Sequence, residues 1–181
     1  MNPFDEQTTV SPKSDDGVTL SIRNVRAVLA DRIIDDATVI VEDGLITSID
    51  SDGVTNRDAL DGAGLFLLPG LIDTHSDGLE KEIAPRRTVE FPLEFALGSF
   101  EGRARAAGVT TMFHGLAYQD RPRLGRSVER ARDIDRAIRR RSLDPLAGVD
   151  HHVLYRFEAR DEGALAPLLI DLTENDQTIC T

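Results

Sequence analysis

His75 and Asp77 are the two side chains whose types and spacing best suit metal chemistry. They stand two residues apart, after an apolar pair at 71–72 and a Pro-Gly break at 69–70. Residues i and i+2 of a β-strand face the same side, so the imidazole and the carboxylate can point at one ion. The C-terminal ends of the strands are where (β/α) barrels place their active sites. The alternative is an ordinary surface or core pair, because His-x-Asp alone has little specificity.

Three basic residues follow this pair at a short distance: Lys81, Arg86 and Arg87. The whole chain has 21 Lys and Arg against 32 Asp and Glu, a formal net charge of -11, so a basic cluster beside a metal motif is unexpected. Arginine binds phosphate as a fork and lysine binds it as a point charge. The cluster therefore predicts binding of substrate phosphate. The alternative is a surface ion-pair network with the nearby acids Glu80, Glu82 and Glu90.

Two further side chains are candidates for supporting the ligands. Asp73 lies two residues before His75 and can hold it in position. His114 ends a second predicted strand, where it can support the site or contact substrate, although a structural core histidine is the favoured alternative. His151 and His152 precede a third predicted strand, at the end opposite the active-site mouth, and are expected to be structural.

The composition limits the class of protein. With 181 residues, 40% of them hydrophobic, the chain can form a real core. Its acidic excess argues against a nucleic-acid partner. Cys180 is the single cysteine of the sequence, so no internal disulfide forms and a reducing, cytoplasmic location is expected. The polar N-terminus lacks the apolar stretch of a secretory signal, and no segment suits a membrane span, so no membrane partner is expected.

The basic residues are unevenly chosen, because 19 of the 21 are arginine. An Asp-rich and Lys-poor surface suits a salt-adapted, halophilic cytoplasm, where high salt screens the repulsion between like charges. The alternative is a GC-rich genome that favours Arg and Asp codons.

The first part of the chain predicts a small β-layer. After a disordered tail at 1–17, strand patterns cover 18–30, 37–42 and 45–49, and Asp43-Gly44 forms a hairpin turn between the last two. A polar loop at 51–61 leads to a further apolar segment at 65–68. We therefore expect an N-terminal β domain at 18–68, of sandwich type and without helical periodicity.

The rest of the chain alternates strands with helices. Strands are predicted at 71–74, 109–113 and 153–157, with a fourth beginning at 178–180. A long loop runs to Phe91; helices follow from Pro92 to Gly108, at 127–141, and after a capping Asp161. This is an α/β pattern with about three βα units. It predicts that 69–181 form the N-terminal part of a TIM-like (β/α) barrel. A closed barrel has eight such units, so the sequence looks truncated; a complete small open sheet is the alternative.

The segment 68–75, Leu-Pro-Gly-Leu-Ile-Asp-Thr-His, between a β-layer and a barrel pattern, resembles the amidohydrolase superfamily of metal-dependent hydrolases. Residues 75–81, with Ala-Pro-Arg at 84–86, resemble a narrower family, the α-D-ribose 1-methylphosphonate 5-triphosphate diphosphatases of the carbon–phosphorus lyase pathway. That family has His-x-Asp where most amidohydrolases have His-x-His. The resemblance continues at 107–113 and 150–158. The sequence departs from the family pattern in three places: Gly78 for Asn, His114-Gly115 for Asp-Ala, and Arg87 for Pro.

The resemblance implies hydrolysis of a phosphoanhydride, with release of pyrophosphate from a small phosphorylated substrate in phosphonate metabolism. It implies a divalent cofactor, zinc or else manganese or another divalent ion, held by His75, Asp77 and, if two ions bind, a bridging Glu158. Glu158 as a solvated acid at the start of a loop is the alternative. Later strands of the family supply further histidines and an aspartate, so this N-terminal portion is expected to be inactive alone. Whether the full-length family member forms a homo-oligomer is left open. Another amidohydrolase, a deacetylase or cyclic amidohydrolase, and a non-catalytic remnant are the alternative functions.

Overall fold

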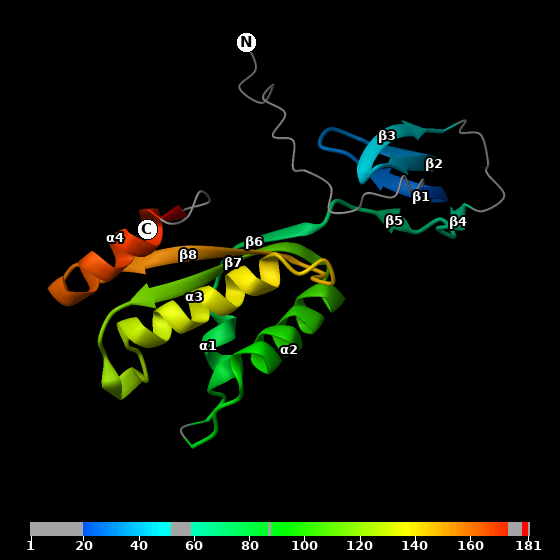
Figure 1. Cartoon of the computed structure of the whole chain (residues 1–181). Coiled ribbons are helices and arrows are strands. Elements are labelled where there is room, and N and C mark those ends of the chain that lie inside the picture. Colours follow the sequence, from blue (N-terminus) through cyan, green and yellow to red (C-terminus); the bar gives the residue numbers. More distant parts are fainter. Residues whose placement is uncertain (1–19, 52–58, 87, 174–178, 181) are drawn as a thin grey trace, which may run out of the picture. The chain divides into compact units, whose positions relative to one another are not determined.

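The computed structural model of the chain describes residues 20–51, 59–86, 88–173 and 179–180. The tail predicted at 1–17, most of the loop predicted at 51–61, and Arg87 lie outside the described residues. The chain divides into two compact units, Met1–Pro69 and Gly70–Thr181, each of which is described by itself (Figure 1). The boundary falls within the Pro-Gly break that precedes the His-x-Asp motif.

The first unit contains one mixed sheet. Its strand order is β3-β2-β1-β4, and β5 also pairs with β1. The strands are β1 (Leu20–Val28), β2 (Ile33–Glu42), β3 (Leu45–Asp50), β4 (Leu60–Asp61) and β5 (Phe66–Leu67). The first three are antiparallel neighbours, whereas β4 and β5 run parallel to β1. The sandwich-type layer expected from the sequence is therefore wrong for the described residues, because the last two strands return to β1 instead of forming a second layer.

Turn chemistry explains the hairpin between β2 and β3. Asp43 and Gly44 have φ values of 50° and 77°, which is the left-handed conformation that a two-residue hairpin turn requires. Val25, Ala27, Ala37 and Val39 form the buried cluster on this sheet. The described residues 20–51 and 59–69 contain strands and turns and no helix.

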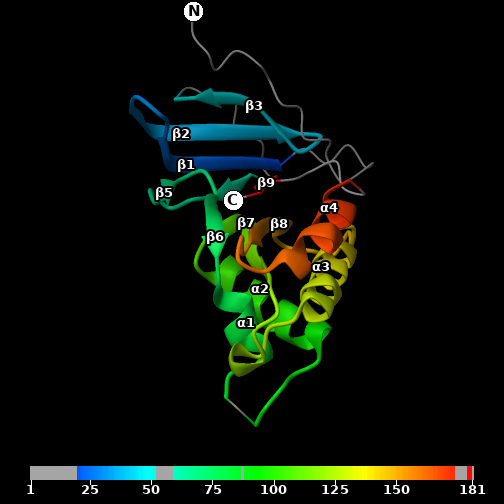
Figure 2. The ribbon, with the colours of Figure 1, turned by 90° about the vertical axis from the view of Figure 1, so that its left-hand side faces the viewer.

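The second unit has a parallel sheet in the order β6-β7-β8-β9. Its strands are β6 (Leu71–Ser76), β7 (Val109–Tyr118), β8 (Asp150–Phe157) and β9 (Ile179–Cys180). The helices are α1 (Gly78–Ile83), α2 (Leu93–Ala106), α3 (Val128–Ser142) and α4 (Leu165–Thr173), with 3-10 turns η1 (Pro122–Leu124) and η2 (Glu162–Ala164). The predicted α/β alternation is thus present, and Figure 2 shows the unit from a second side.

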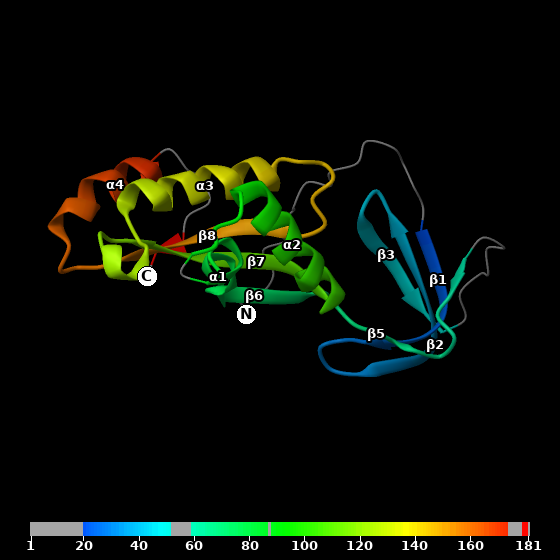
Figure 3. The ribbon, with the colours of Figure 1, turned by 90° about the horizontal axis from the view of Figure 1, so that it is seen from below.

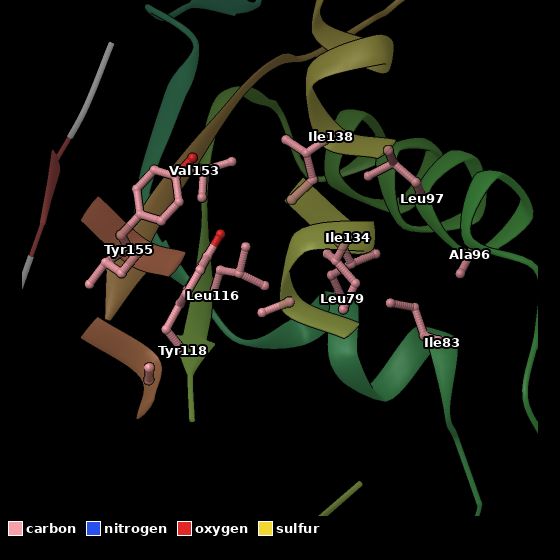
Figure 4. Packing of buried hydrophobic residues seen from close by; sticks show 13 residues of the cluster. Leu79, Ile83, Ala96, Leu97, Leu116, Tyr118, Ile134, Ile138, Val153 and Tyr155 are labelled. Carbon is pink, nitrogen blue, oxygen red and sulfur yellow. The ribbon is translucent and has the colours of Figure 1, made fainter. Parts of the chain in front are cut away.

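The loop predicted to run to Phe91 is wrong, because α1 lies within it. Six residues are too few to give a helical period in the sequence. The helix forms because Leu79 and Ile83, one turn apart, are both buried. They join the main core, which packs α1, α2, α3 and α4 against β7 and β8 (Figures 3 and 4).

Strand β7 presents two different faces. Leu116 and Tyr118 point into the core that the helices cover, and Met112 contacts the same layer through Ala104 of α2. Alternation along a strand sends Phe113 and Gly115 to the opposite face. There Phe113 stacks on His152 of β8, with ring centroids 4.7 Å apart.

The helix ends follow their sequence signals with one exception. Gly108, with φ 83°, ends α2, and the Ser127 hydroxyl accepts a hydrogen bond from the Arg130 backbone at the start of α3. The Asp161 side chain makes no capping hydrogen bond; its carboxylate accepts from the Asp120 backbone N–H at 2.6 Å instead. No helix in the described part of the chain is long and apolar enough to cross a membrane.

Candidate metal centre

His75 and Asp77 meet at the C-terminal end of β6. The His75 Nε2 lies 3.7 Å from the Asp77 Oδ1, and about half of each side chain is exposed, 50% and 52%. Strand β6 ends at Ser76, and its pairing with β7 shifts register between Asp73 and Ser76. The two side chains therefore converge at an irregular strand end that leads directly into α1.

Gly115 of β7 provides the space that this pair occupies. A Cβ atom at Gly115 would lie 2.7 Å from the Asp77 Oδ1 and 3.2 Å from the His75 Nε2. A Cβ there would require a shift of these half-exposed side-chain ends, so glycine lets the two donor atoms lie close to the β7 backbone. A neutral imidazole nitrogen and a carboxylate oxygen are both zinc donors. The donor types and the space over Gly115 fit one divalent ion.

Arg156 is a third member of this site that the sequence prediction missed. Its Nη2 lies 2.8 Å from the Asp77 Oδ1 and donates to the Gly115 carbonyl at 3.4 Å. Its Nε is buried and has no hydrogen-bond partner among the described residues. Its parity along β8 places it with His152 on the face opposite the helices, but only the pairing of β8 with β7 brings it to Asp77.

Glu158 has arginine partners in the structure. Its carboxylate pairs with the Arg160 Nε at 2.9 Å and with the Arg121 Nη2 at 3.2 Å. Hydrogen bonds from the Arg160 side chain and backbone, and the charge of Arg121, lower the pKa of Glu158 to about 2. Within the described ranges, no three His, Cys, Asp or Glu side chains are grouped to hold a metal ion. The bridging role of Glu158 stays a prediction that requires these arginines to be displaced.

The predicted basic cluster is only partly described. Lys81 is exposed on α1, Arg86 is exposed in the following loop, and Arg87 lies outside the described residues. The alternative was a surface network between these basic residues and three nearby glutamates. In the structure the three glutamates pair instead with arginines from α2, α3 and the β7–α3 loop. These pairs are Glu80–Arg126, Glu82–Arg103 and Glu90–Arg130. Phosphate binding by Lys81, Arg86 and Arg87 stays a prediction.

The two predicted supporting residues occupy different places. The Asp73 carboxylate accepts from the His75 backbone N–H at 3.1 Å, so it shapes the chain at His75 and does not contact the imidazole. His114 is 2% exposed and lies in the helix-covered layer, 6.0 Å from the Phe100 ring centroid. Its Nε2 is 2.9 Å from the His151 Nδ1. These contacts give His114 a position in the core, and its role beside the ligands stays a prediction.

The buried histidines form a directed chain. Burial alone would raise the pKa of Glu101, but hydrogen bonds from Arg141, the Gly148 backbone and His151 lower it to about 2. The ionised Glu101 Oε2 therefore accepts from the His151 Nε2 at 3.1 Å. His151 then accepts at Nδ1 from the His114 Nε2, which leaves the buried His114 Nδ1 as an unpaired acceptor.

No protein-family model matches the chain. The chain is 29% identical over 155 residues to the alpha-D-ribose 1-methylphosphonate 5-triphosphate diphosphatase of Escherichia coli (strain K12). That match covers 86% of this chain and 40% of the relative, so the chain spans about 40% of the length of the curated protein it matches.

Solved structures of amidohydrolases share the fold. N-isopropylammelide isopropylaminohydrolase from Burkholderia multivorans ATCC 17616 superimposes with a TM-score of 0.53 at 22% identity, over 88% of this chain and 44% of that chain. A structure of another amidohydrolase gives 0.52 at 17% identity, over 76% and 32% of the two chains. Molinate hydrolase gives 0.51 at 18% identity, over 77% and 30%. Each match covers less than half of the larger protein.

Proposed function

We propose that this chain, a homologue within the amidohydrolase superfamily, supplies the first-strand ligands of a divalent-metal hydrolase that cleaves a phosphoanhydride in a small phosphorylated substrate. The similarity to the E. coli diphosphatase supports the substrate class. The parallel β6–β9 sheet with its helices is the part of the proposed (β/α) barrel that holds these ligands.

One observation carries the proposal: Gly115 leaves the space in which His75 and Asp77 converge. The His75 Nε2 and the Asp77 Oδ1 lie 3.7 Å apart beside a strand position without a side chain, so an ion can approach both atoms. The half-exposed state of both side chains leaves their donor atoms accessible to an ion and to substrate.

The residues have separate tasks in this chemistry. His75 and Asp77 would hold a divalent ion through one imidazole nitrogen and one carboxylate oxygen, and Asp73 fixes the backbone at His75. Such an ion would supply an activated water and would polarise a phosphoryl oxygen. In the overall reaction the oxygen of water adds to phosphorus, the bridging P–O bond breaks, pyrophosphate leaves with the electron pair of that bond, and a proton passes to solvent. Arg156 balances the charge of Asp77 before an ion binds.

The test is zinc and manganese binding to the 181-residue chain, measured by competition with a chromophoric chelator. His75→Ala and Asp77→Ala should each weaken binding at least about tenfold, because each removes one ligand. Gly115→Leu should do the same without removing a ligand, because a bulky side chain would fill the space beside the two donor atoms. Gly98→Ala is the matched control, because a Cβ there meets nothing within 4 Å. Binding by Gly115→Leu equal to wild type would overturn the proposal.

An assay of hydrolytic activity gives an independent test of the proposal. Pyrophosphate release from a ribose 5-triphosphate phosphonate should be negligible for the 181-residue chain, because His75 and Asp77 are two ligands where catalytic zinc has about three. Turnover that His75→Ala abolishes would show that the pair suffices, which would overturn this expectation. Metal binding that survives His75→Ala unchanged would remove the pair from the proposed site.

A further inference from the structure

A pocket of about 1090 Å³ lies beside the C-terminal end of β7, within the second unit. Its walls are the segments 84–86 and 88–90, which follow α1, and the loop between β7 and α3, at 122–127. Pockets for small molecules usually have volumes of roughly 300–1,000 Å³. This pocket is large enough for a small molecule together with its first water layer.

The lining of the pocket is positively charged. It includes the four arginines Arg86, Arg123, Arg126 and Arg130, against two carboxylates. Both carboxylates are neutralised: Glu80 receives a fork from Arg126, with Nη2 at 2.6 Å, and Glu90 receives Arg130 at 2.6 Å. Since the whole chain carries a net charge of -11, an excess of two cations in one hollow favours an anionic occupant.

Arg86 and Arg123 are the two cations left over. Both are exposed, and no ion pair joins either of them to a carboxylate within the described residues. The Glu80–Arg126 pair links α1 to the loop that carries Arg123. The loops that present the two guanidinium groups are therefore both anchored to the helix layer.

The floor of the pocket is apolar. Ile83 of α1, Leu116 of β7 and Ile134 of α3 lie there, each at most 5% exposed (Figure 4). A cationic rim above an apolar floor suits a molecule with an anionic group and a less polar body. Free inorganic ions would use only the rim.

We propose that this pocket binds a small polyanion of the di- or triphosphate type, with Arg86 and Arg123 as its anion contacts. Guanidinium forks match phosphate oxygens in geometry and charge. The inference rests on the proposed function only for the phosphorylated nature of the ligand. Its residues are separate from His75 and Asp77, so binding does not require the metal.

The experiment is calorimetric titration of the 181-residue chain with inorganic triphosphate in EDTA, at low and high salt. Arg123→Gln and Arg86→Gln should each weaken binding about tenfold, as expected for the loss of one charged hydrogen bond. Arg136→Gln is the matched control, because this α3 arginine pairs with Asp133 and does not line the pocket. The control should bind triphosphate as wild type does.

The outcomes separate this inference from the proposed function. Equal weakening by Arg136→Gln, or no weakening by Arg123→Gln, would overturn the pocket assignment, because binding would then be general charge attraction. His75→Ala should leave triphosphate binding in EDTA unchanged. If the chain binds zinc but not triphosphate, only the pocket proposal is rejected. If it binds triphosphate but not zinc, only the metal-site proposal is rejected. Unchanged near-UV circular dichroism shows that each variant is folded.

Discussion

The Arg156 guanidinium forms an ion pair with the Asp77 carboxylate, with Nη2 2.8 Å from Oδ1. This contact joins the C-terminal end of β8 to the turn after β6, and it passes over Gly115 of β7. A candidate metal ligand thus has a cation of the protein as its partner. An ion that binds Asp77 must share that carboxylate with Arg156 or displace it.

Replacing Arg156 by Gln should therefore raise the affinity for divalent ions. The loss of one positive charge next to the ligand removes a repulsion of about 1 kcal/mol or more at a half-exposed site, which corresponds to roughly a fivefold increase in affinity. Chelator competition measures it, with Arg136→Gln as the control. A lower affinity would show instead that Arg156 holds Asp77 in the orientation that the ion needs.

Two glycines near α2 should respond in opposite ways to alanine. Gly98 is exposed within the helix and has open space around it, so Gly98→Ala should stabilise the protein by about 0.5–1 kcal/mol. A Cβ at Gly78 would lie 2.4 Å from the Phe100 ring, so Gly78→Ala should destabilise it by about 1–3 kcal/mol. Urea unfolding measures both. Equal effects would mean that the α1–α2 contact is looser than described.

His114 should make the fold sensitive to acid. Burial, then the neighbouring His151 and His152, lowers the pKa of His114 from 6.5 to about 3. The unfolded chain binds this proton below pH 6.5 and the folded chain does not, so stability is full above pH 6.5 and falls as the pH drops towards 3. The loss approaches about 1.4 kcal/mol per pH unit for one proton.

His114→Gln should reduce this acid sensitivity. Glutamine keeps a donor for the His151 Nδ1 but does not titrate. The slope of unfolding free energy against pH between 4 and 6 should become shallower, as urea titrations at each pH would show. The carboxylate of Glu101, whose pKa is lowered to about 2, contributes its own loss below its ordinary value of 4.5 in both proteins. An unchanged slope would mean that His114 is already protonated in the fold.

The Tyr118 hydroxyl, which links β7 to α4, should make a measurable contribution to the stability of the fold. The hydroxyl donates to the buried Asp171 Oδ2 at 2.6 Å, and Arg132 of α3 also pairs with Asp171. Tyr118→Phe should cost about 1–3 kcal/mol, because the hydrogen bond is to a buried charged group. The urea midpoint measures the loss, and an unchanged slope of the transition shows that the same structure unfolds. A midpoint equal to wild type would contradict this account.

The convergence of His75 and Asp77 was predictable because its signal is local. The spacing of His75 and Asp77 and the apolar residues before them lie within one short segment. The contributions of Gly115 and Arg156 come from two other strands, and only strand pairing brings them to the same place. Glu158 illustrates the reverse case. Its position at a strand end was predictable, and Arg160 is only two residues away, but Arg121 reaches it from a loop after a different strand.

The fold shows the same division between local and non-local information. Turn and cap residues such as Asp43-Gly44, Gly108 and Ser127 act on their own neighbours, and the element ends next to them were predicted closely. The far ends were not: β7 continues past the predicted 109–113 to Tyr118, so the prediction that His114 ends its strand is wrong. The parallel return of β4 and β5 to β1 was not predicted, because pairing between distant short strands leaves no periodic pattern. Helix α1 was missed because burial by other elements, not its own six residues, stabilises it.

The carboxylate of Glu101 has a consequence for how the second unit opens to solvent. It projects from α2 and accepts from Arg141 of α3, from the Gly148 amide at 2.8 Å, and from His151 of β8. If any one of these partners moves away, the buried Glu101 carboxylate loses a hydrogen-bond donor while it is still buried, which is costly. The C-terminal turn of α3, the following loop and the start of β8 should therefore open as one unit. Their amide hydrogens should exchange with deuterium at a common free energy, and Glu101→Gln should split that unit into separately exchanging parts.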